Sequence, residues 1–413
     1  MDPSVKSPIE NKPIEKPPRA EKRFSVAPMM DWTDRHYRFL ARQLSKRAVL
    51  YTEMIHARAI VHGDRSRFLD FHPEESPVVL QLGGNEPEYL AEAARWAERW
   101  GYSEINLNCG CPSEKVASGS FGACLMADPG HVARLVETMK KAVSIPVTVK
   151  SRIGIEARGM NPLSDYEHLR RFTATMVEAG CDRLIVHARI AVLGGLNPAE
   201  NRTVPPLRYE DVYRLKDEFP ELPVELNGGL REIAAIQKHL NGPLDGVMVG
   251  RAAYETPRIL LYVDDIMNEV DAGMHSLGQS SPEKHSGVDW TPGPSFGGQN
   301  TEDWRQATGD MRAVRELERL SGPLQRMGDY IVSMREEGVP AARITRHLLG
   351  LFHGLPGAKR FRQTLSGNQV KQLNDMDDLD GFLRQFFAES EGERIGNAVR
   401  ELKLKRSGIL EET

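Results

Sequence analysis

Residues 224–251 read VELNGGLREIAAIQKHLNGPLDGVMVGR, and this stretch decides the fold. Two short apolar runs, Val224–Asn227 and Gly246–Val249, flank a segment with helical spacing, Ile233–Leu240. Short apolar runs bounded by turn residues are typical of buried strands, and a helix between two such strands predicts that they pair in parallel. The stretch is therefore one β–α–β unit.

The same alternation runs through the chain from residue 24 onward. The sequence predicts strands at Phe24–Met29, Ala48–Met54, Val78–Gly83, Glu104–Asn108, Val147–Lys150, Arg183–His187, Val224–Asn227 and Gly246–Val249. Helical spacing lies between them at Pro87–Trp100, His131–Val143, Tyr166–Ala179 and Ile233–Leu240. Eight consecutive β–α units predict an α/β fold of the (β/α)8 TIM-barrel type. A doubly wound open sheet is the alternative, but Ala27-Pro28-Met29-Met30-Asp31 stands where that fold normally has G-x-G-x-x-G.

Changes in composition along the chain predict five segments. Residues 1–22 are rich in Pro, Lys and Glu, and residues 273–309 are rich in Gly, Ser and Pro without a helical period. Helical spacing returns in Met311–Glu337, Ile344–Phe352 and Gln369–Leu404. We therefore expect a disordered tail at 1–22, the barrel at 23–272, a flexible linker or insertion at 273–309, a helical domain at 310–404 and a tail at 405–413.

The overall charge and the cysteines exclude several classes of protein. Fifty-four Lys and Arg residues against 58 Asp and Glu residues give a net charge of −4, so a nucleic-acid partner needs a local basic patch. The four cysteines fit neither a disulfide framework nor the C-x2-C spacing of a zinc pair, and we expect no metal. The sequence has no apolar run of about 18 residues and no apolar leader segment, which argues against a membrane span or a secretion signal and favours the cytoplasm.

Polar residues follow every predicted strand. In a barrel, the carboxyl ends of the strands converge on the face that holds the active site. Loops begin with polar residues in any protein, but eight ends that carry amide, imidazole, ammonium, thiol and guanidinium groups favour a site. These ends are Pro28-Met29, Glu53, Gln81, Asn108 with Cys111, Lys150 with Arg152, His187 with Arg189, Asn227-Gly228-Gly229 and Gly250-Arg251.

Two of these ends are typical of phosphate binding. Glycines in Asn227-Gly228-Gly229 let backbone N–H groups approach phosphate oxygens, and the guanidinium of Gly250-Arg251 can bind two oxygens at once. Lys150 lies on an apolar strand, where a buried ammonium group needs an anion or a polar group such as a flavin or a substrate carbonyl. His187 ends another apolar run and is either a hydrogen-bonded core residue or part of the site.

Cys111 lies in a glycine-flanked loop just beyond the fourth predicted strand, within Asn108-Cys109-Gly110-Cys111-Pro112-Ser113. A thiol with the ordinary pKa of about 8.5 is mostly protonated at neutral pH, so it can serve as a general acid or as a nucleophile. We expect Cys109 and Cys124 to be packed in the core and Cys181 to be structural.

Several motifs, in order over roughly residues 23–370, resemble the tRNA dihydrouridine synthases. They are Ala27-Pro28-Met29-x3-Thr33-Asp34, Gln81-Leu82-Gly83-Gly84, Asn106-Leu107-Asn108-x2-Cys111-Pro112-Ser113, Gly119-x2-Gly122-Ala123-x-Leu125-Met126, Thr148-Val149-Lys150-x-Arg152-x-Gly154, Val186-His187-Ala188-Arg189 and Asn227-Gly228-Gly229. Two further motifs resemble the A-type (20/20a) subfamily in particular: Leu196-Asn197-Pro198-x2-Asn201-Arg202-x2-Pro205-Pro206-Leu207-Arg208-Tyr209, and Arg343-Ile344-Thr345-Arg346-His347 with Gly354-x-Pro356-Gly357-Ala358.

The resemblance implies reduction of the C5=C6 bond of uridine in the D-loop of tRNA, at positions 20 and 20a, by FMN that NADPH re-reduces. Cys111 matches the family's proton donor to C5, and Asn108 and Arg202 match positions near tRNA. Ala199 stands where the subfamily usually has a basic residue, which questions one phosphate contact. The positions that match flavin contacts are Pro28, Met29, Met30, Gln81, Lys150 and His187, and those that match the FMN phosphate cradle are Asn227, Gly228, Gly229, Gly250 and Arg251.

A basic segment near the C-terminus predicts an RNA partner from the residues themselves. From Ala341 to Asn374 the chain has six Lys or Arg residues and no Asp or Glu. Such asymmetry in an acidic chain favours phosphate contacts, whereas a solvated helix face normally mixes both signs. Lys359 and Arg362 share a helix face at i,i+3 spacing and match tRNA-contact positions of the subfamily.

Two other functions remain open from the residues. A flavoenzyme for a free pyrimidine, similar to the dihydroorotate dehydrogenases, accounts for the barrel, the phosphate site and the cysteine but leaves the basic segment without a role. A non-catalytic tRNA-binding protein accounts for the basic segment but not for Lys150, His187 and Cys111 at strand ends.

Overall fold

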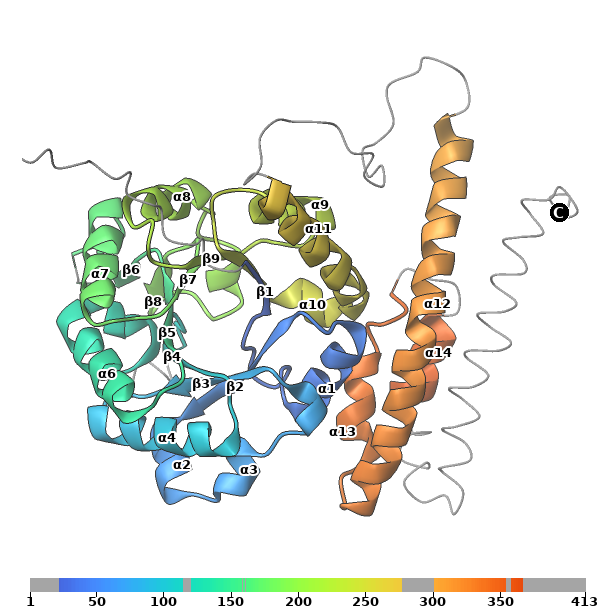
Figure 1. The fold of residues 1–413 in the computed structure, drawn as a ribbon, viewed down its shortest axis with the longest axis horizontal. Helices are drawn as coiled ribbons and strands as arrows, with labels where there is room; N and C mark the ends of the chain where they lie inside the picture. Colours follow the sequence, from blue (N-terminus) through green and yellow to red (C-terminus); the bar gives the residue numbers. More distant parts are fainter. Residues whose placement is uncertain are drawn as a thin grey trace, which may run out of the picture.

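The computed structural model describes residues 22–113, 120–157, 159, 161–276, 301–353 and 358–366. Eight parallel strands close into a barrel in the order β1-β10-β9-β7-β5-β4-β3-β2 (Figure 1). They are β1 (Arg23–Val26), β2 (Val49–His56), β3 (Val78–Gly83), β4 (Glu104–Cys109), β5 (Val147–Arg152), β7 (Leu184–His187), β9 (Val224–Asn227) and β10 (Gly246–Val249). Each predicted strand overlaps one of these, so the TIM-barrel prediction is confirmed.

Helices surround the barrel. Side chains of Asp128 and Asp165 cap two of them by accepting from backbone N–H groups, and Gly101, at φ 90°, ends another in the left-handed conformation. The outer helices are α1 (Arg35–Leu44), α2 (Ala57–His62), α3 (Arg65–Leu69), α4 (Pro87–Trp100), α6 (Pro129–Ala142), α7 (Tyr166–Glu178), α8 (Tyr209–Glu218), α9 (Ile233–Leu240), α10 (Arg251–Glu255) and α11 (Val263–Ser276). Four of them, α4, α6, α7 and α9, lie where the sequence predicts helices.

Helix α1 was not among the predicted helices, although Tyr37, Leu40, Ala41 and Leu44 give it an apolar stripe at helical spacing. It also buries two charged side chains beside this stripe. Arg38 donates to the Glu75 carboxylate and to the Thr33 carbonyl, both at 2.8 Å. Arg42 donates to the backbone carbonyls of Ser45, Lys46, Glu75 and Pro77, so that both buried guanidinium groups have partners.

The barrel interior is polar at its base, and its middle holds both apolar and polar side chains. At the base, Arg23 pairs with Glu104 at 2.7 Å and Arg183 pairs with Glu225 at 3.3 Å. Above these pairs, the side chains of Ala27, Val49, Tyr51, Val79, Ile185 and Met248 form a small buried cluster. The centre is therefore filled, and a ligand has room only beyond the carboxyl ends of the strands.

Two short strands that the sequence did not predict form a separate parallel pair, β6 (Ile155–Ala157) with β8 (Ala191–Leu193). The buried Asn201 stabilises this addition. Its amide donates to the carbonyls of Val192 at 3.0 Å and Leu196 at 2.9 Å, and its oxygen accepts from the Val192 N–H at 2.8 Å. These hydrogen bonds fix the short 3-10 helix Glu200–Arg202, which carries Arg202.

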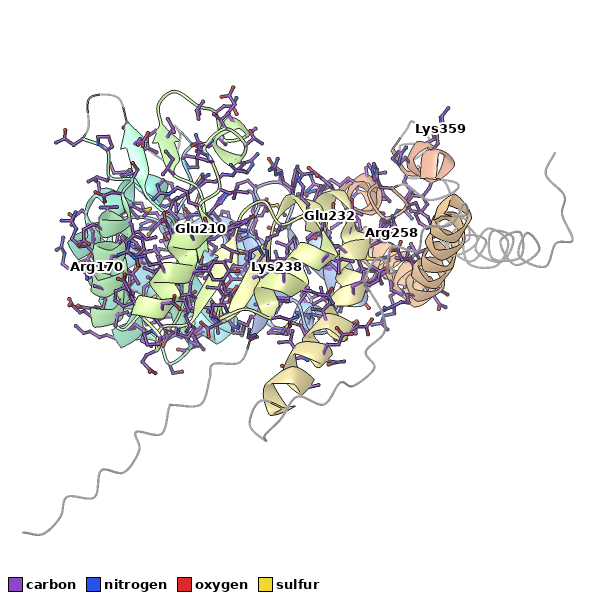
Figure 2. The ribbon with its side chains drawn as sticks, turned by 90° about the horizontal axis from the view of Figure 1, so that it is seen from above. Arg170, Glu210, Glu232, Lys238, Arg258 and Lys359 are labelled. Carbon is purple, nitrogen blue, oxygen red and sulfur yellow. The ribbon has the colours of Figure 1, made fainter. Side chains whose placement is uncertain are left out.

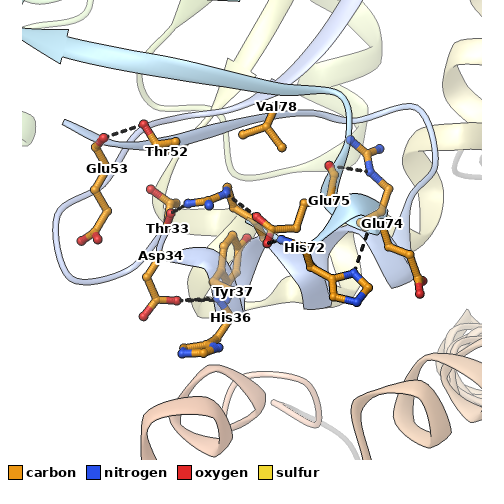
Figure 3. Close-up of polar contacts among 12 residues, drawn as sticks. Thr33, Asp34, His36, Tyr37, Thr52, Glu53, His72, Glu74, Glu75 and Val78 are labelled. Atoms are coloured by element: carbon orange, nitrogen blue, oxygen red, sulfur yellow. Dashed lines mark hydrogen bonds and ion pairs between the residues drawn. The ribbon is translucent and has the colours of Figure 1, made fainter. Parts of the chain in front are cut away.

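The C-terminal helices pack on the side of the barrel formed by α1, α10 and α11 (Figure 1). They are α12 (Thr301–Glu336), α13 (Ala341–Thr345), the 3-10 turn Arg346–Leu348 and α14 (Ala358–Ser366). One apolar cluster joins them to the barrel and includes Phe39, Leu324, Tyr330 and Ile344. Asp34, the N-cap of α1, pairs with Arg346 at 2.6 Å and His347 at 3.0 Å, and Figure 3 shows Asp34 and His36 facing these helices.

Three expected boundaries need correction. The linker was expected to end at residue 309, but α12 begins at Thr301. Residues 301–309 read TEDWRQATG, and their Thr, Asp and Gly residues have low helix propensity, which is why this turn-rich composition predicted a linker. Lys22 was expected in the tail, but it is buried and donates to the Gly242 carbonyl at 2.7 Å. The single helix expected at Ile344–Phe352 is instead the end of α13 followed by a 3-10 turn.

The remaining domain predictions lie outside the described residues. They concern the tail at 1–21, most of the linker, the helices expected in Gln369–Leu404 and the tail at 405–413. Among the residues that are described, no helix is both long and apolar enough to cross a membrane.

Candidate active site

The inward-facing residues at the strand ends meet at the mouth of the barrel. Strand register places Asn108 beside Lys150, Arg152 beside His187, and His187 beside Asn227. Five neighbouring side chains from four strands thus line one side of the mouth, as the barrel topology predicts.

Cys111 lies in the loop after β4, and its backbone is held on both sides. The Asn108 side-chain oxygen accepts from the N–H groups of Gly110 at 3.1 Å and Cys111 at 3.0 Å, and the Cys111 carbonyl accepts from Ala123 at 2.9 Å. Arg152 donates to the Gly110 carbonyl at 3.2 Å. The loop is thus anchored while the cysteine itself stays partly exposed.

The other cysteines have different surroundings. Cys109 and Cys181 are buried as expected, and burial raises the pKa of both thiols, that of Cys181 to about 12. Cys124 is half-buried, which corrects the expectation of a core residue, and its thiol donates to the Phe121 carbonyl at 2.9 Å. It lies in a short 3-10 helix at the edge of the cluster, where an apolar-looking run does not ensure full burial.

Lys150 is a cation held in an unfavourable environment. Burial of its ammonium group and, to a lesser extent, the charge of Arg152 lower its pKa to about 7, although Cys111 acts in the opposite direction. None of the hydrogen bonds among the described residues involves this ammonium group. A group in this position favours a ligand that brings negative charge or a carbonyl oxygen.

The depressed pKa of Lys150 predicts a pH-dependent cost to folding. Between about pH 7 and the unfolded value of 10.5, the unfolded chain keeps a proton that the folded chain releases, so stability rises with pH across this window. Below about pH 7 the cost is constant and largest. We expect Lys150→Met to raise the thermal midpoint of ligand-free protein at pH 6, by about 2–4 °C for each kcal/mol of relieved desolvation.

Calorimetry at pH 6 and pH 9 tests this expectation, with Lys141→Met, at an exposed lysine of α6, as the control. The gain from Lys150→Met should be smaller at pH 9 than at pH 6, while Lys141→Met should show no such trend. An equal gain at both pH values would show that the Lys150 ammonium is not desolvated in the folded protein.

His187 is buried and neutral. Burial, together with the positive charges of Arg152 and Lys150, lowers its pKa well below the ordinary value. Gly228 lies directly against its ring, since a Cβ atom built on Gly228 would be 2.6 Å from the imidazole Cδ2. The ring therefore faces the glycine pair after β9, and the hydrogen bonds among the described residues do not support the alternative of a hydrogen-bonded core histidine.

The glycine pair after β9 has backbone conformations that side chains rarely adopt. Gly228 has φ 112° and Gly229 has φ 71°. A Cβ atom on Gly229 would lie 2.5 Å from Leu207 and 2.8 Å from the Tyr209 hydroxyl, which itself donates to the Gly228 carbonyl at 2.7 Å. Asn227 fixes the preceding strand end by donating to the Met248 carbonyl at 2.7 Å. Only glycine fits both positions, as a backbone cradle requires.

Four arginines surround this mouth: Arg152, Arg189, Arg202 and Arg251. Burial, together with the charges of Arg202 and Arg189, lowers the pKa of Arg152 to about 10. Burial and the charge of Arg251 also lower the pKa of Arg202. Arg152 donates to the carbonyls of Ile190 at 2.9 Å and Asn201 at 2.8 Å rather than to a carboxylate. The cluster therefore keeps a net positive charge, which favours an anionic ligand.

The turn after β1 supplies the remaining predicted residues. Met30 is 56% exposed, and Met29 lies against Gly250, whose added Cβ would be 3.7 Å from the methionine sulfur. Thr33 holds the turn by accepting from the Met29 N–H at 3.0 Å. Pro28 and Met29 thus lie at the strand end next to Gly250, while Gln81 lies deeper and bonds to Asn106 and Asn108.

The structure adds residues to which the sequence gave no role. Tyr209 supports Gly228, and Arg152 anchors the Cys111 loop. Asn106 and Thr148 lie inside the barrel and are fully buried. Their alternation with apolar neighbours on β4 and β5 is the signal that marks them as inward-facing.

The cations of the basic segment 341–374 have different surroundings in the structure. Arg346 is used in the ion pair with Asp34, whereas Lys359 and Arg362 are exposed on α14. Figure 2 shows Lys359 at the opposite end of the molecule from Arg170. Lys371 lies outside the described residues. No group of three or more His, Cys, Asp or Glu side chains in the described part of the chain is arranged to hold a metal ion.

A closed parallel barrel with a loop thiol, a glycine cradle and a cationic mouth defines a barrel enzyme for an anionic ligand. Comparison with known proteins is more specific: the sequence pattern of the family described as dihydrouridine synthase (Dus) matches residues 25–276. The chain therefore belongs to the dihydrouridine synthase family, whose members are flavin-dependent oxidoreductases, and the resemblance seen in the motifs is confirmed.

Curated relatives cover most of the chain. A protein of Synechocystis is 49% identical over 346 residues, which are 84% of this chain and 89% of the relative. Proteins of Xanthomonas axonopodis pv. citri and Pseudomonas aeruginosa are each 45% identical, over 84% and 86% of this chain and 89% and 92% of their own lengths. All three bear the name tRNA-dihydrouridine(20/20a) synthase.

Proposed function

We propose that this protein reduces the C5=C6 bond of uridine to dihydrouridine at positions 20 and 20a in the D-loop of tRNA, with FMN as its cofactor and NADPH as its reductant, in the cytoplasm. The names of the relatives support the tRNA substrate. The observation that carries the chemistry is the anchored, partly exposed Cys111 beside Lys150 and Asn108 at the barrel mouth.

The residues at the mouth fit FMN. Gly228 and Gly229 have backbone conformations suited to a phosphate cradle, and Arg251 adds positive charge at the mouth, where burial and this charge lower the pKa of Arg189 and Arg202. Lys150, with its pKa lowered by burial, gains a partner when a flavin ring carbonyl or an anionic flavin lies near it. When bound, reduced FMN supplies a hydride to C6 of the uracil.

The chain's own groups supply the rest of the reaction. The Cys111 thiol delivers a proton to C5, so that hydride and proton together saturate the double bond. Asn108 holds the backbone of Cys111 and lies beside the Lys150 strand, where it can also contact the base. Arg202, fixed by the Asn201 hydrogen bonds to the mouth, contacts the RNA backbone.

The two other functions predict different outcomes. A free-pyrimidine flavoenzyme would leave tRNA unmodified, and a non-catalytic RNA-binding protein would bind tRNA without oxidising NADPH.

The test uses unmodified tRNA incubated with purified protein, FMN and NADPH. Each of the uridines at positions 20 and 20a is expected to gain two hydrogens, measured by mass spectrometry of nuclease fragments. A protein that oxidises NADPH with FMN yet leaves these fragments unchanged in mass would contradict the proposal.

The exposed cations of α14 give a prediction about tRNA binding. Replacing Lys359 and Arg362 together by Gln should reduce the magnitude of the slope of log affinity against log salt by about 2. Each lost phosphate contact accounts for about 1, because a neutralised phosphate releases counterions. Filter binding between about 50 and 200 mM salt measures the slope. NADPH oxidation without RNA should stay unchanged, since these residues lie on α14 rather than at the barrel mouth.

The matched control removes two cations far from α14. Arg170 and Lys141 are exposed on α7 and α6, and Figure 2 places Arg170 at the other end of the molecule. Arg170→Gln with Lys141→Gln should leave the salt slope unaltered. Equal slopes for the two double variants would remove α14 from tRNA recognition.

A further inference from the structure

We infer that Glu104, Thr148 and Asn106 are positioning residues: they fix the direction of a series of hydrogen bonds and thereby the orientation of the Asn108 amide in the active site. They belong to a continuous chain of buried side chains that starts at the base of the barrel and ends at the backbone of Cys111. The inference rests on the proposed function for the identity of the substrate. The effect of the chain on the position of Cys111 does not depend on that substrate.

Every link of the chain is a hydrogen bond of ordinary length. The Thr148 hydroxyl donates to Glu104 at 2.7 Å and accepts from the Asn106 amide at 2.9 Å. The Asn106 oxygen accepts from the Gln81 amide at 2.8 Å, and the Gln81 oxygen accepts from the Asn108 amide at 2.8 Å. The Asn108 oxygen then accepts from the Gly110 and Cys111 backbone N–H groups. All donors therefore point toward the base of the barrel.

The two ends of the chain fix this direction. Backbone N–H groups of Gly110 and Cys111 can only donate, so they require the oxygen of Asn108 rather than its amide nitrogen. At the base, the Glu104 carboxylate pairs with Arg23 at 2.7 Å and can only accept. Each amide between the ends has a nitrogen and an oxygen that could exchange places, but reversing any one of them would set two donors or two acceptors face to face.

The fixed direction determines what Asn108 offers to a ligand. Its oxygen already accepts two N–H groups, and one of its two amide hydrogens goes to Gln81. Within the part of the chain that the structure describes, one N–H therefore remains for the mouth of the barrel. A single donor there suits a ring carbonyl, which uracil has at C4, and does not suit the exocyclic amine that cytosine has at the same position.

Thr148→Val tests the chain at its centre. The change keeps the branched shape but removes the acceptor of the Asn106 amide and the donor to Glu104. We expect kcat for uridine reduction to fall about tenfold, the effect of one buried hydrogen bond lost, with KM for tRNA unchanged. Thr148→Ser, which keeps the hydroxyl, should restore kcat to within about twofold.

The matched control is Ser25→Ala. Ser25 is also fully buried in the barrel, and its hydroxyl donates to the other buried carboxylate, Glu225, at 2.8 Å, but it lies outside the chain. Ser25→Ala should leave kcat nearly unchanged. Should Thr148→Val fail to fold, Thr148→Ala compared with Ser25→Ala gives the same contrast.

A second measurement does not depend on the reaction. The rate of iodoacetamide alkylation of Cys111, followed by mass spectrometry in flavin-free protein with Cys124 as internal reference, should change in Thr148→Val and not in Ser25→Ala. The inference would be overturned if Thr148→Val and Ser25→Ala had the same kcat and the same rate of Cys111 alkylation. It would also be overturned if Thr148→Ser lost as much activity as Thr148→Val. If the wild-type protein does not reduce uridine, the proposed function fails, and the alkylation rates still test the chain.

Discussion

Replacement of Cys111 by Ala is expected to lower uridine reduction about 10²–10⁴-fold, the usual contribution of a positioned general acid. The loop should remain in place, because it is held through the backbone of Gly110 and Cys111 rather than through the thiol. Binding of FMN and its reduction by NADPH should therefore persist. Rapid mixing of the reduced variant with unmodified tRNA, followed by flavin absorbance, separates these steps.

Cys124→Ala is the control for this experiment. Its thiol is also partly exposed, but it donates to the Phe121 carbonyl and lies in the 3-10 helix Gly122–Ala127 that follows the Cys111 loop. Uridine reduction by this variant should stay within about threefold of wild type, as expected for the loss of one weak hydrogen bond. Comparable losses in the two variants would mean that packing around the loop, rather than proton donation by Cys111, limits the rate.

Gly229→Ala is expected to weaken FMN binding about 10–100-fold. The added Cβ atom would lie 2.5 Å from Leu207 and 2.8 Å from the Tyr209 hydroxyl, and overpacking of this kind costs about 1–3 kcal/mol. Displacing Tyr209 also breaks its hydrogen bond to the Gly228 carbonyl, so the cradle itself must change shape. Titration of flavin-free protein with FMN, followed by quenching of flavin fluorescence, measures the affinity.

Gly180→Ala separates local strain from loss of the cradle. Gly180 has φ 76°, close to the 71° of Gly229, but a Cβ atom there meets nothing within 4 Å. Both variants should lose stability from the left-handed backbone, by about 1–2 kcal/mol. Only Gly229→Ala should lose FMN affinity. If the two variants bind FMN equally well, the glycine pair after β9 is not the phosphate cradle.

Most of the site could be predicted because a barrel turns sequence order into spatial proximity. Lys150, His187 and Asn227 are far apart in the chain, yet each ends an apolar run, and the carboxyl ends of parallel strands meet at one face. Gly228 and Gly229 were recognisable for a similar local reason, since two adjacent glycines after a strand are typical of a backbone that must approach a ligand closely.

Other features left no local signal. The burial of Arg38 and Arg42 on helix α1 could not be predicted, because only the distant Glu75 and the surrounding carbonyls make it tolerable. The start of α12 was missed because its first residues include Thr, Asp and Gly, which have low helix propensity. The partial exposure of Cys124 also depends on how its 3-10 helix packs rather than on its apolar neighbours.

The sequence by itself determined the eight-stranded barrel and the residues that its strand ends bring together, because apolar period and strand-end chemistry are local properties of the chain. Only the tertiary structure decided the direction of the hydrogen-bonded chain from Glu104 to Cys111 and the pairing of Asp34 with Arg346. An amide side chain carries both a donor and an acceptor, and its orientation depends on partners that lie on other strands. Those partners become neighbours only when the barrel closes.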